Sequence, residues 1–237
     1  MHEFLYGTGL LAAYFVVAAG TALSCRMMFP IPDELFRKIL HCILLGSLMV
    51  FVSGYETWWM AALVSLGFAA VVYPLLAYFE RFAGFSRLTT ERKTGELKHS
   101  LLLVFGMFAA VMALCWGALG ERYLVLASIY AWGFGDAAAA LVGKRFGKHK
   151  IHWKYTDGKK SAEGSAAMFL LSFLSVAVIL TLRGGLGVFP LIIVSFVTAL
   201  VAAAAELYSK DGNDTVICPL SAMAALLGML YLFGGLL

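Results

Sequence analysis

Long apolar stretches separated by short polar connections run through the whole chain. A helix needs about 20 apolar residues to cross the hydrocarbon layer of a membrane. Because only helices and closed barrels satisfy their backbone hydrogen bonds in lipid, and these stretches do not alternate like strands, we predict an all-α polytopic membrane bundle. It has about eight transmembrane helices in one domain over residues 1–237, at 4–23, 39–54, 57–79, 99–118, 123–143, 164–182, 187–206 and 216–236.

The first two stretches need separate interpretation. The stretch 4–23 follows His2 and Glu3 rather than basic residues, and no small-residue cleavage site precedes the next stretch. We therefore interpret it as a spanning helix and not as a signal peptide. The stretch 39–54 is short, which predicts a helix that is tilted, interfacial or extended at its charged end.

Composition agrees with the membrane interpretation. The chain is 62% hydrophobic and 14% charged, with a mean hydropathy of +0.87, which excludes a soluble domain of this size. The four cysteines are scattered, so neither a disulfide framework nor a zinc site is predicted. They are Cys25, Cys42, Cys115 and Cys218.

Basic residues fall almost entirely in alternate connections, which predicts the orientation of the chain. Only Arg122 and Arg183 lie on the opposite side, so both termini are expected outside and the basic connections in the cytoplasm. We expect the protein in the inner (cytoplasmic) membrane with its site facing the cytoplasm. Nucleic-acid binding is not expected, because the cations lie in short juxtamembrane loops. These cations are Arg26, Arg37, Lys38, Arg81, Arg87, Arg92, Lys93, Lys98, Lys144, Arg145, Lys148, Lys150, Lys154, Lys159, Lys160 and Lys210.

The central candidate for chemistry is Asp136, an acidic residue inside an Ala-rich apolar helix. A carboxylate in this position is costly and marks a functional site, although a structural hydrogen bond is the alternative. On a helix it shares a face with Ala140, Gly143 and Gly147, and a glycine-punctuated basic loop of residues 143–148 follows. This loop lacks the spacing of a Walker A motif. A carboxylate beside such cations indicates a divalent metal and a polyphosphate.

Further polar elements lie on the same predicted side. Lys159 to Ser165 opens the sixth stretch, where Ser161 can cap the helix and its N-terminus can bind an anion, with capping alone as the alternative. Glu206 ends the seventh stretch, and Pro219 is expected to open the last helix. Between them lie potential oxygen ligands for Mg²⁺, or an ordinary polar turn and cap, at Asp211, Asn213 and Asp214.

An earlier basic element precedes the second stretch. Arg37 and His41 fall on one helix face at a spacing of i, i+4. His41 alone is equally well interpreted as a buried residue that makes one hydrogen bond.

Three elements, at about 33–41, 133–165 and 206–219, resemble in order and spacing the CTP-dependent lipid kinases of the dolichol kinase and phytol kinase group. That group is related to phosphatidate cytidylyltransferases. The central element, Gly135-Asp136 with 143–147 and Lys160-Ser161-x-Glu163-Gly164-Ser165, is the specific one. The resemblance implies an integral membrane enzyme that uses Mg²⁺ to transfer the γ-phosphoryl group of CTP to a membrane lipid alcohol such as a polyprenol, phytol, farnesol or diacylglycerol.

Within this resemblance, each candidate residue has an expected role. The expected catalytic residues are Asp136, Glu206 and Lys160, with His41 or a carboxylate as the base. Mg²⁺ is expected on Asp136, Glu206, Asp211, Asn213 and Asp214. The expected nucleotide-binding residues are Arg37, Lys144, Arg145, Lys148, Lys159, Ser161, Glu163, Gly164 and Ser165.

Two other functions stay open at this point. A cytidylyltransferase that forms CDP-diacylglycerol is the alternative within the superfamily, although the short late element with Lys210 as its only cation favours a kinase. An ion-coupled transporter is the remote alternative, disfavoured because the polar residues gather on one face of the membrane. The oligomeric state and the lipid acceptor leave no signal in the sequence.

Overall fold

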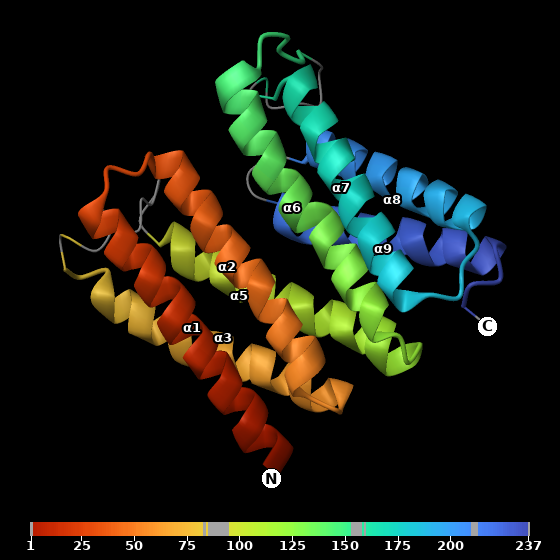
Figure 1. The fold of residues 1–237 in the computed structure, drawn as a ribbon. Helices are drawn as coiled ribbons and strands as arrows, with labels where there is room; N and C mark the ends of the chain where they lie inside the picture. Colours follow the sequence, from red (N-terminus) through yellow and green to blue (C-terminus); the bar gives the residue numbers. More distant parts are fainter. Residues whose placement is uncertain are drawn as a thin grey trace. The chain divides into compact units, whose positions relative to one another are not determined.

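The computed structural model describes residues 2–82, 84, 95–152, 158, 160–209 and 213–236 (Figure 1). Among these residues, secondary structure is helical apart from one isolated β-bridge, and eight helical spans are long and apolar enough to cross a membrane. The predicted all-α bundle is confirmed. The helices are α1 (His2–Met28), α2 (Asp33–Gly54), α3 (Trp58–Phe79), α5 (Glu96–Val111) with the π-helix η1 (Met112–Ala118), α6 (Arg122–Phe146), α7 (Ala162–Arg183), α8 (Val188–Tyr208) and α9 (Asp214–Leu232).

The short second stretch is extended at its charged end, which is one of the three predicted possibilities. Helix α2 begins at Asp33, directly after Pro32, and is 22 residues long. Asp33 and Glu34 favour this start because acidic side chains stabilise the positive end of the helix dipole. The Glu34 carboxylate also lies 3.5 Å from the Arg37 guanidinium on the next turn.

Several predicted boundaries differ from the structure by a few residues, and two of these differences affect the candidate residues. Helix α6 does not end at Gly143 but continues to Phe146, so Lys144 and Arg145 belong to its last turn rather than to a loop. Cations are favoured there by the negative end of the helix dipole. Pro219 lies inside α9 and does not open it, because the helix already begins at Asp214. Membrane helices tolerate such a proline when neighbouring groups satisfy the freed carbonyl.

Packing divides the chain into two compact units, Met1–Ala113 and Leu114–Leu237. In the first unit α1 packs on α2 and α3 packs on α5, around the buried rings of Phe51, Phe105 and Phe108. The Glu3 carboxylate accepts hydrogen bonds from the backbone N–H groups of Glu56 and Thr57, and so holds the connection just before α3. This division does not test the predicted single domain, which stays a prediction.

In the second unit, α7 packs between α6 and α8, and α9 packs against both α8 and α6. At one end, the Arg183 guanidinium binds the Glu121 carboxylate through two N–H groups, at 2.5 and 3.1 Å, and donates to the Gly235 carbonyl. This arginine therefore ties the start of α6, the end of α7 and the C-terminal segment together. The candidate site lies at the other end of these helices.

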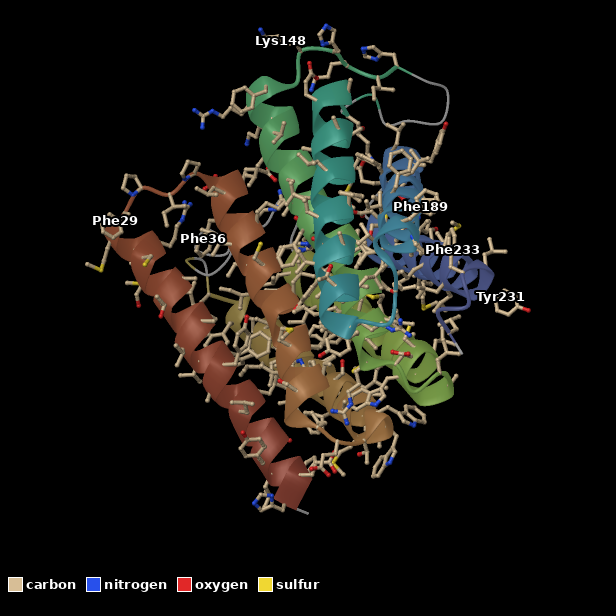
Figure 2. All side chains as sticks on the ribbon, turned by 45° about the vertical axis from the view of Figure 1, so that its right-hand side comes forward. Phe29, Phe36, Lys148, Phe189, Tyr231 and Phe233 are labelled. Atoms are coloured by element: carbon tan, nitrogen blue, oxygen red, sulfur yellow. The ribbon has the colours of Figure 1, made fainter. Side chains whose placement is uncertain are left out.

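The outward surfaces of the helices are those of a membrane protein. Large apolar side chains are exposed along them, including Val71 and Val178. Exposed aromatic residues stand near the start of α8 and the end of α9, where rings favour the boundary between lipid and water: Phe189, Tyr231 and Phe233 (Figure 2). All four cysteines are free thiols in the structure.

Candidate functional site

Glu206 lies within electrostatic range of two carboxylates from other helices in the second unit. Asp136 comes from the middle of α6, Glu206 from the last turn of α8 and Asp214 from the first turn of α9. Glu206 interacts electrostatically with both aspartates. We call these three residues the carboxylate cluster. Its members are 8 to 78 residues apart in the sequence, and the packing of α6, α8 and α9 against one another brings them together.

Lys160 brings a positive charge to the carboxylate cluster. Its ammonium lies 3.1 Å from the Glu206 carboxylate oxygen Oε1. It also donates to the Glu206 carbonyl and, at 3.1 Å, to the Ser209 carbonyl, at the end of α8. Both side chains are largely buried, with 16% of the Lys160 side chain and 11% of the Glu206 side chain exposed. A charge pair this sheltered is screened only weakly by solvent and salt.

The inner face of α8 explains why Glu206 is buried. Ser195, Thr198, Ala199 and Ala202 precede it on the same face, and all four are fully buried. Such small side chains let neighbouring helices approach closely in a membrane. The carboxylate of Glu206 therefore ends a stripe of small residues and lies between helices rather than in water.

In the connection between α6 and α7, two short backbone segments pair with each other, and the second of them contains Lys160. Lys150 and Ser161 form an antiparallel bridge. The Ile151 N–H donates to the Lys160 carbonyl at 3.0 Å, and the Ala162 N–H donates to the His149 carbonyl at 2.9 Å. These bonds fix the backbone of Lys160 at the start of α7, so its side chain is held within reach of α8.

Ser161 is the predicted helix cap, and the structure confirms it. The Ser161 hydroxyl accepts a hydrogen bond from the Gly164 N–H at 3.2 Å. Its side chain is buried beneath three glycines. A Cβ atom placed on Gly143 or Gly164 would lie 3.3 Å from the Ser161 oxygen, and one on Gly147 would lie 2.6 Å from it. The small-residue face predicted for α6 thus allows α7 to approach closely.

Exposed cations surround this connection. Lys144 and Arg145 project from the last turn of α6, and Lys148 is exposed at the connection itself (Figure 2).

Lys159 and Asp211, both predicted site residues, lie outside the described residues. Asn213 directly precedes α9 without forming a side-chain cap, and among the described groups the buried Ser165 hydroxyl has no hydrogen-bond partner.

Glu163 holds the connection between α6 and α7 from the α7 side. Its carboxylate oxygens accept from the His149 backbone N–H at 3.2 and 3.3 Å, and one of them lies 2.7 Å from the His149 ring nitrogen Nδ1. The carboxylate also accepts from the Lys148 backbone. Glu163 thus fixes the backbone that carries Lys148.

Replacing Glu163 by Ala is expected to accelerate amide hydrogen exchange at Lys148 and His149, because both N–H groups lose their acceptor. Hydrogen–deuterium exchange with mass spectrometry measures this directly. Glu163→Gln, which keeps one oxygen acceptor, should show a smaller increase. Unchanged exchange in the alanine variant would contradict the role of Glu163 in holding this backbone.

The early basic element lies in the first unit, whereas the carboxylate cluster is built entirely from helices of the second. Arg37 and His41 are on α2, as the i, i+4 spacing predicted. Lys38, next to Arg37, is only 8% exposed. The roles expected for Arg37 in nucleotide binding and for His41 as a base stay predictions.

The donor atoms of the carboxylate cluster suit Mg²⁺, but not as a metal centre made by protein alone. Among the described residues, no group of three or more His, Cys, Asp or Glu side chains is placed to hold a metal ion. Mg²⁺ in nucleotide-dependent enzymes is commonly held by one or two carboxylates together with substrate phosphates. The pair of Asp136 and Glu206 fits that second arrangement.

Sequence reasoning missed the partners of two site residues. The Ser209 carbonyl, which accepts from Lys160, carries no side-chain signal, although a cation near a helix C-terminus is a common pairing. His149 binds Glu163 across 14 residues of chain, and no spacing rule connects them.

Comparison with known proteins finds three similar chains. A phytol kinase of Synechocystis sp. is 31% identical over 93% of this chain and 90% of its own length. A probable chloroplastic phytol kinase of Zea mays is 27% identical over 89% of this chain and 71% of its own. One of Triticum aestivum is 28% identical over 74% of this chain and 57% of its own. No protein-family model and no solved structure matches the chain.

Proposed function

Because the chain belongs to the phytol kinase family of lipid kinases, we propose that it transfers the γ-phosphoryl group of CTP to the hydroxyl group of a membrane lipid alcohol. The observation that carries this proposal is the meeting of Asp136, Glu206 and Lys160 beside a cationic connection. Phosphoryl transfer depends mainly on positioning and on neutralising charge, and this arrangement supplies both.

The cations around the connection bind the phosphates in this proposal. Lys144, Arg145, Lys148, Lys159 and Lys160 neutralise the triphosphate. The start of α7 adds the positive end of its helix dipole and the Ser165 hydroxyl, which has no hydrogen-bond partner among the described groups. Ser161, Glu163 and Gly164 act through shape, because the cap and the glycine contact fix where α7 begins.

Asp136 and Glu206 hold Mg²⁺ in this proposal, with Asp211, Asn213 or Asp214 assisting directly or through water. Bound Mg²⁺ would neutralise charge on the transferring phosphate and orient it for in-line attack. The oxygen of the lipid hydroxyl forms a bond to the γ-phosphorus, the bond from that phosphorus to the bridging oxygen breaks, and CDP leaves. A carboxylate of the cluster accepts the hydroxyl proton.

The depth of Asp136 supports a lipid acceptor. Asp136 lies ten residues before the end of α6, which corresponds to about 15 Å along the helix at the usual rise. A hydroxyl attached to a long apolar tail can reach this depth while the tail stays among lipid chains. The names of the relatives favour phytol or a similar isoprenoid alcohol. The distribution of cations places the site at the cytoplasmic face of the inner membrane in our proposal.

A double-label experiment tests the proposal. Purified protein in lipid vesicles receives Mg²⁺, one acceptor and CTP labelled at either the γ- or the α-phosphate. The acceptors are phytol, farnesol, a polyprenol, diacylglycerol and phosphatidate. We expect label in the lipid from the γ-position only, most strongly with an isoprenoid alcohol. Label from the α-position, with release of pyrophosphate, would instead identify a cytidylyltransferase. Folded protein that transfers neither label would favour the transporter alternative.

A further inference from the structure

The ammonium group of Lys160 has no spare hydrogen-bond donor. It carries three N–H donors, and the structure provides three acceptors for them: the Glu206 carboxylate, the Glu206 carbonyl and the Ser209 carbonyl. A phosphate can therefore bind Lys160 only if one of these acceptors is released. The Glu206 carbonyl belongs to the last turn of α8 and the Ser209 carbonyl directly follows this helix, so releasing either one requires the backbone to move. The carboxylate can leave by rotation of its side chain alone, so it is the acceptor that we expect to be released.

Lys160 binds the same Glu206 carboxylate that a metal ion would need as a ligand. The ammonium lies 3.1 Å from the Glu206 carboxylate oxygen, with both side chains largely buried. The same carboxylate interacts with Asp136 and Asp214, so this single ammonium neutralises part of the charge of the whole carboxylate cluster. No set of three acidic, His or Cys side chains in the described part of the chain is arranged to chelate a metal ion.

Resting on the proposed function, we infer that Lys160 is the resident counter-cation of the carboxylate cluster and keeps Glu206 from binding a divalent cation until a nucleotide arrives. The nucleotide phosphates then take over the Lys160 ammonium, and Glu206 becomes free to bind the cation that accompanies them. Without nucleotide, the carboxylate cluster therefore binds a divalent cation only weakly.

The exchange is chemically balanced because each charge finds a new partner. Lysine is a compact charge on a flexible stem of four carbons, so its ammonium can exchange a carboxylate for a phosphate by rotation of the side chain. Phosphate oxygens accept charge-assisted hydrogen bonds as carboxylates do. The backbone of Lys160 need not move, since its carbonyl stays bonded to the Ile151 N–H.

Binding of Mn²⁺ to the full-length protein in detergent, without nucleotide, tests the inference. The electron paramagnetic resonance signal of free Mn²⁺ reports this binding independently of activity. We expect weak binding to the unmodified protein and at least about tenfold tighter binding to Lys160→Met, since the carboxylate cluster then lacks its counter-cation. The double variant Lys160→Met/Glu206→Gln should lose this gain. Lys150→Met, which removes a nearby exposed cation, is the matched control and should bind Mn²⁺ like the unmodified protein.

Tight Mn²⁺ binding by the unmodified protein, or no gain in the Lys160 variant, would overturn the inference. If Lys160→Met does not fold, Lys160→Gln removes the charge while keeping a donor for the two carbonyls, and the same criterion applies to it. The label-transfer experiment separates this inference from the proposed function. Transfer from γ-labelled CTP without the Mn²⁺ effect leaves the proposed function standing and refutes the role of Lys160. The Mn²⁺ effect without transfer supports the role of Lys160 as a counter-cation and refutes the proposed function.

Discussion

Replacing Asp136 by Asn is expected to lower lipid phosphorylation by about three orders of magnitude while the protein stays folded in the membrane. The amide has nearly the same shape as the carboxylate but lacks its negative charge, so it binds a divalent cation poorly. Asp136 is also the member of the carboxylate cluster that lies farthest from an end of its helix, whereas Glu206 and Asp214 lie in terminal turns. Turnover with γ-labelled CTP at saturating nucleotide measures the loss.

The matched control is Glu121→Gln, which makes the same chemical change at the other end of α6. Glu121 binds Arg183 and lies away from the carboxylate cluster, so this variant should lower thermal stability but keep turnover. Elution from a size-exclusion column and the thermal midpoint show whether each variant is folded. More than a tenth of normal turnover in folded Asp136→Asn would refute a metal-binding role for Asp136.

Replacing Gly164 by Val is expected to lower the stability of the protein markedly. A Cβ atom on Gly164 would lie 3.0 Å from the Ala139 carbonyl oxygen and 3.3 Å from the Gly143 Cα atom. These are backbone atoms of α6, so they cannot rotate away, and the helices must separate. Overpacking of this kind costs about 1–3 kcal/mol, which the thermal midpoint in detergent will report.

Gly228→Val is the control for this substitution. Gly228 is also a helical glycine of the second unit, but a Cβ atom on it would meet nothing within 4 Å. We expect little change in its thermal midpoint. Activity should fall in Gly164→Val as well, because separating α6 from α7 moves Lys160 relative to Asp136. Equal stability of the two variants would show that the close approach of α6 and α7 is not required.

The helices could be predicted from the sequence because the bilayer imposes a simple requirement, a long run of apolar side chains. For the same reason Asp136 and Glu206 were visible, since charged residues are rare within such runs. The end of α6 was predicted too early, because glycine and lysine are typical of loops. Here Gly143 faces Gly164 across the helix contact, and the cations suit the helix C-terminus.

Other parts of the site could not be predicted because their signal lies in the backbone. The acceptors of Lys160 include two carbonyl groups, which every residue has. The bond between Glu163 and His149 depends on how the connection folds back on α7. The acceptor alcohol is equally hidden, since positions that contact lipid need only be apolar. Similarity to phytol kinases therefore supports a lipid kinase more specifically than any single residue of the sequence does.

The close contact between α6 and α7 also has a consequence for the order of events during synthesis. Chains fold from the N-terminus as they emerge from the ribosome, and α6 and α7 form the most extensive helix pair among the described residues. This pair can therefore assemble before Glu206 and Asp214 have been translated. During part of biosynthesis Lys160 therefore has no carboxylate partner from α8. The carboxylate cluster is complete only after the last quarter of the chain has been added.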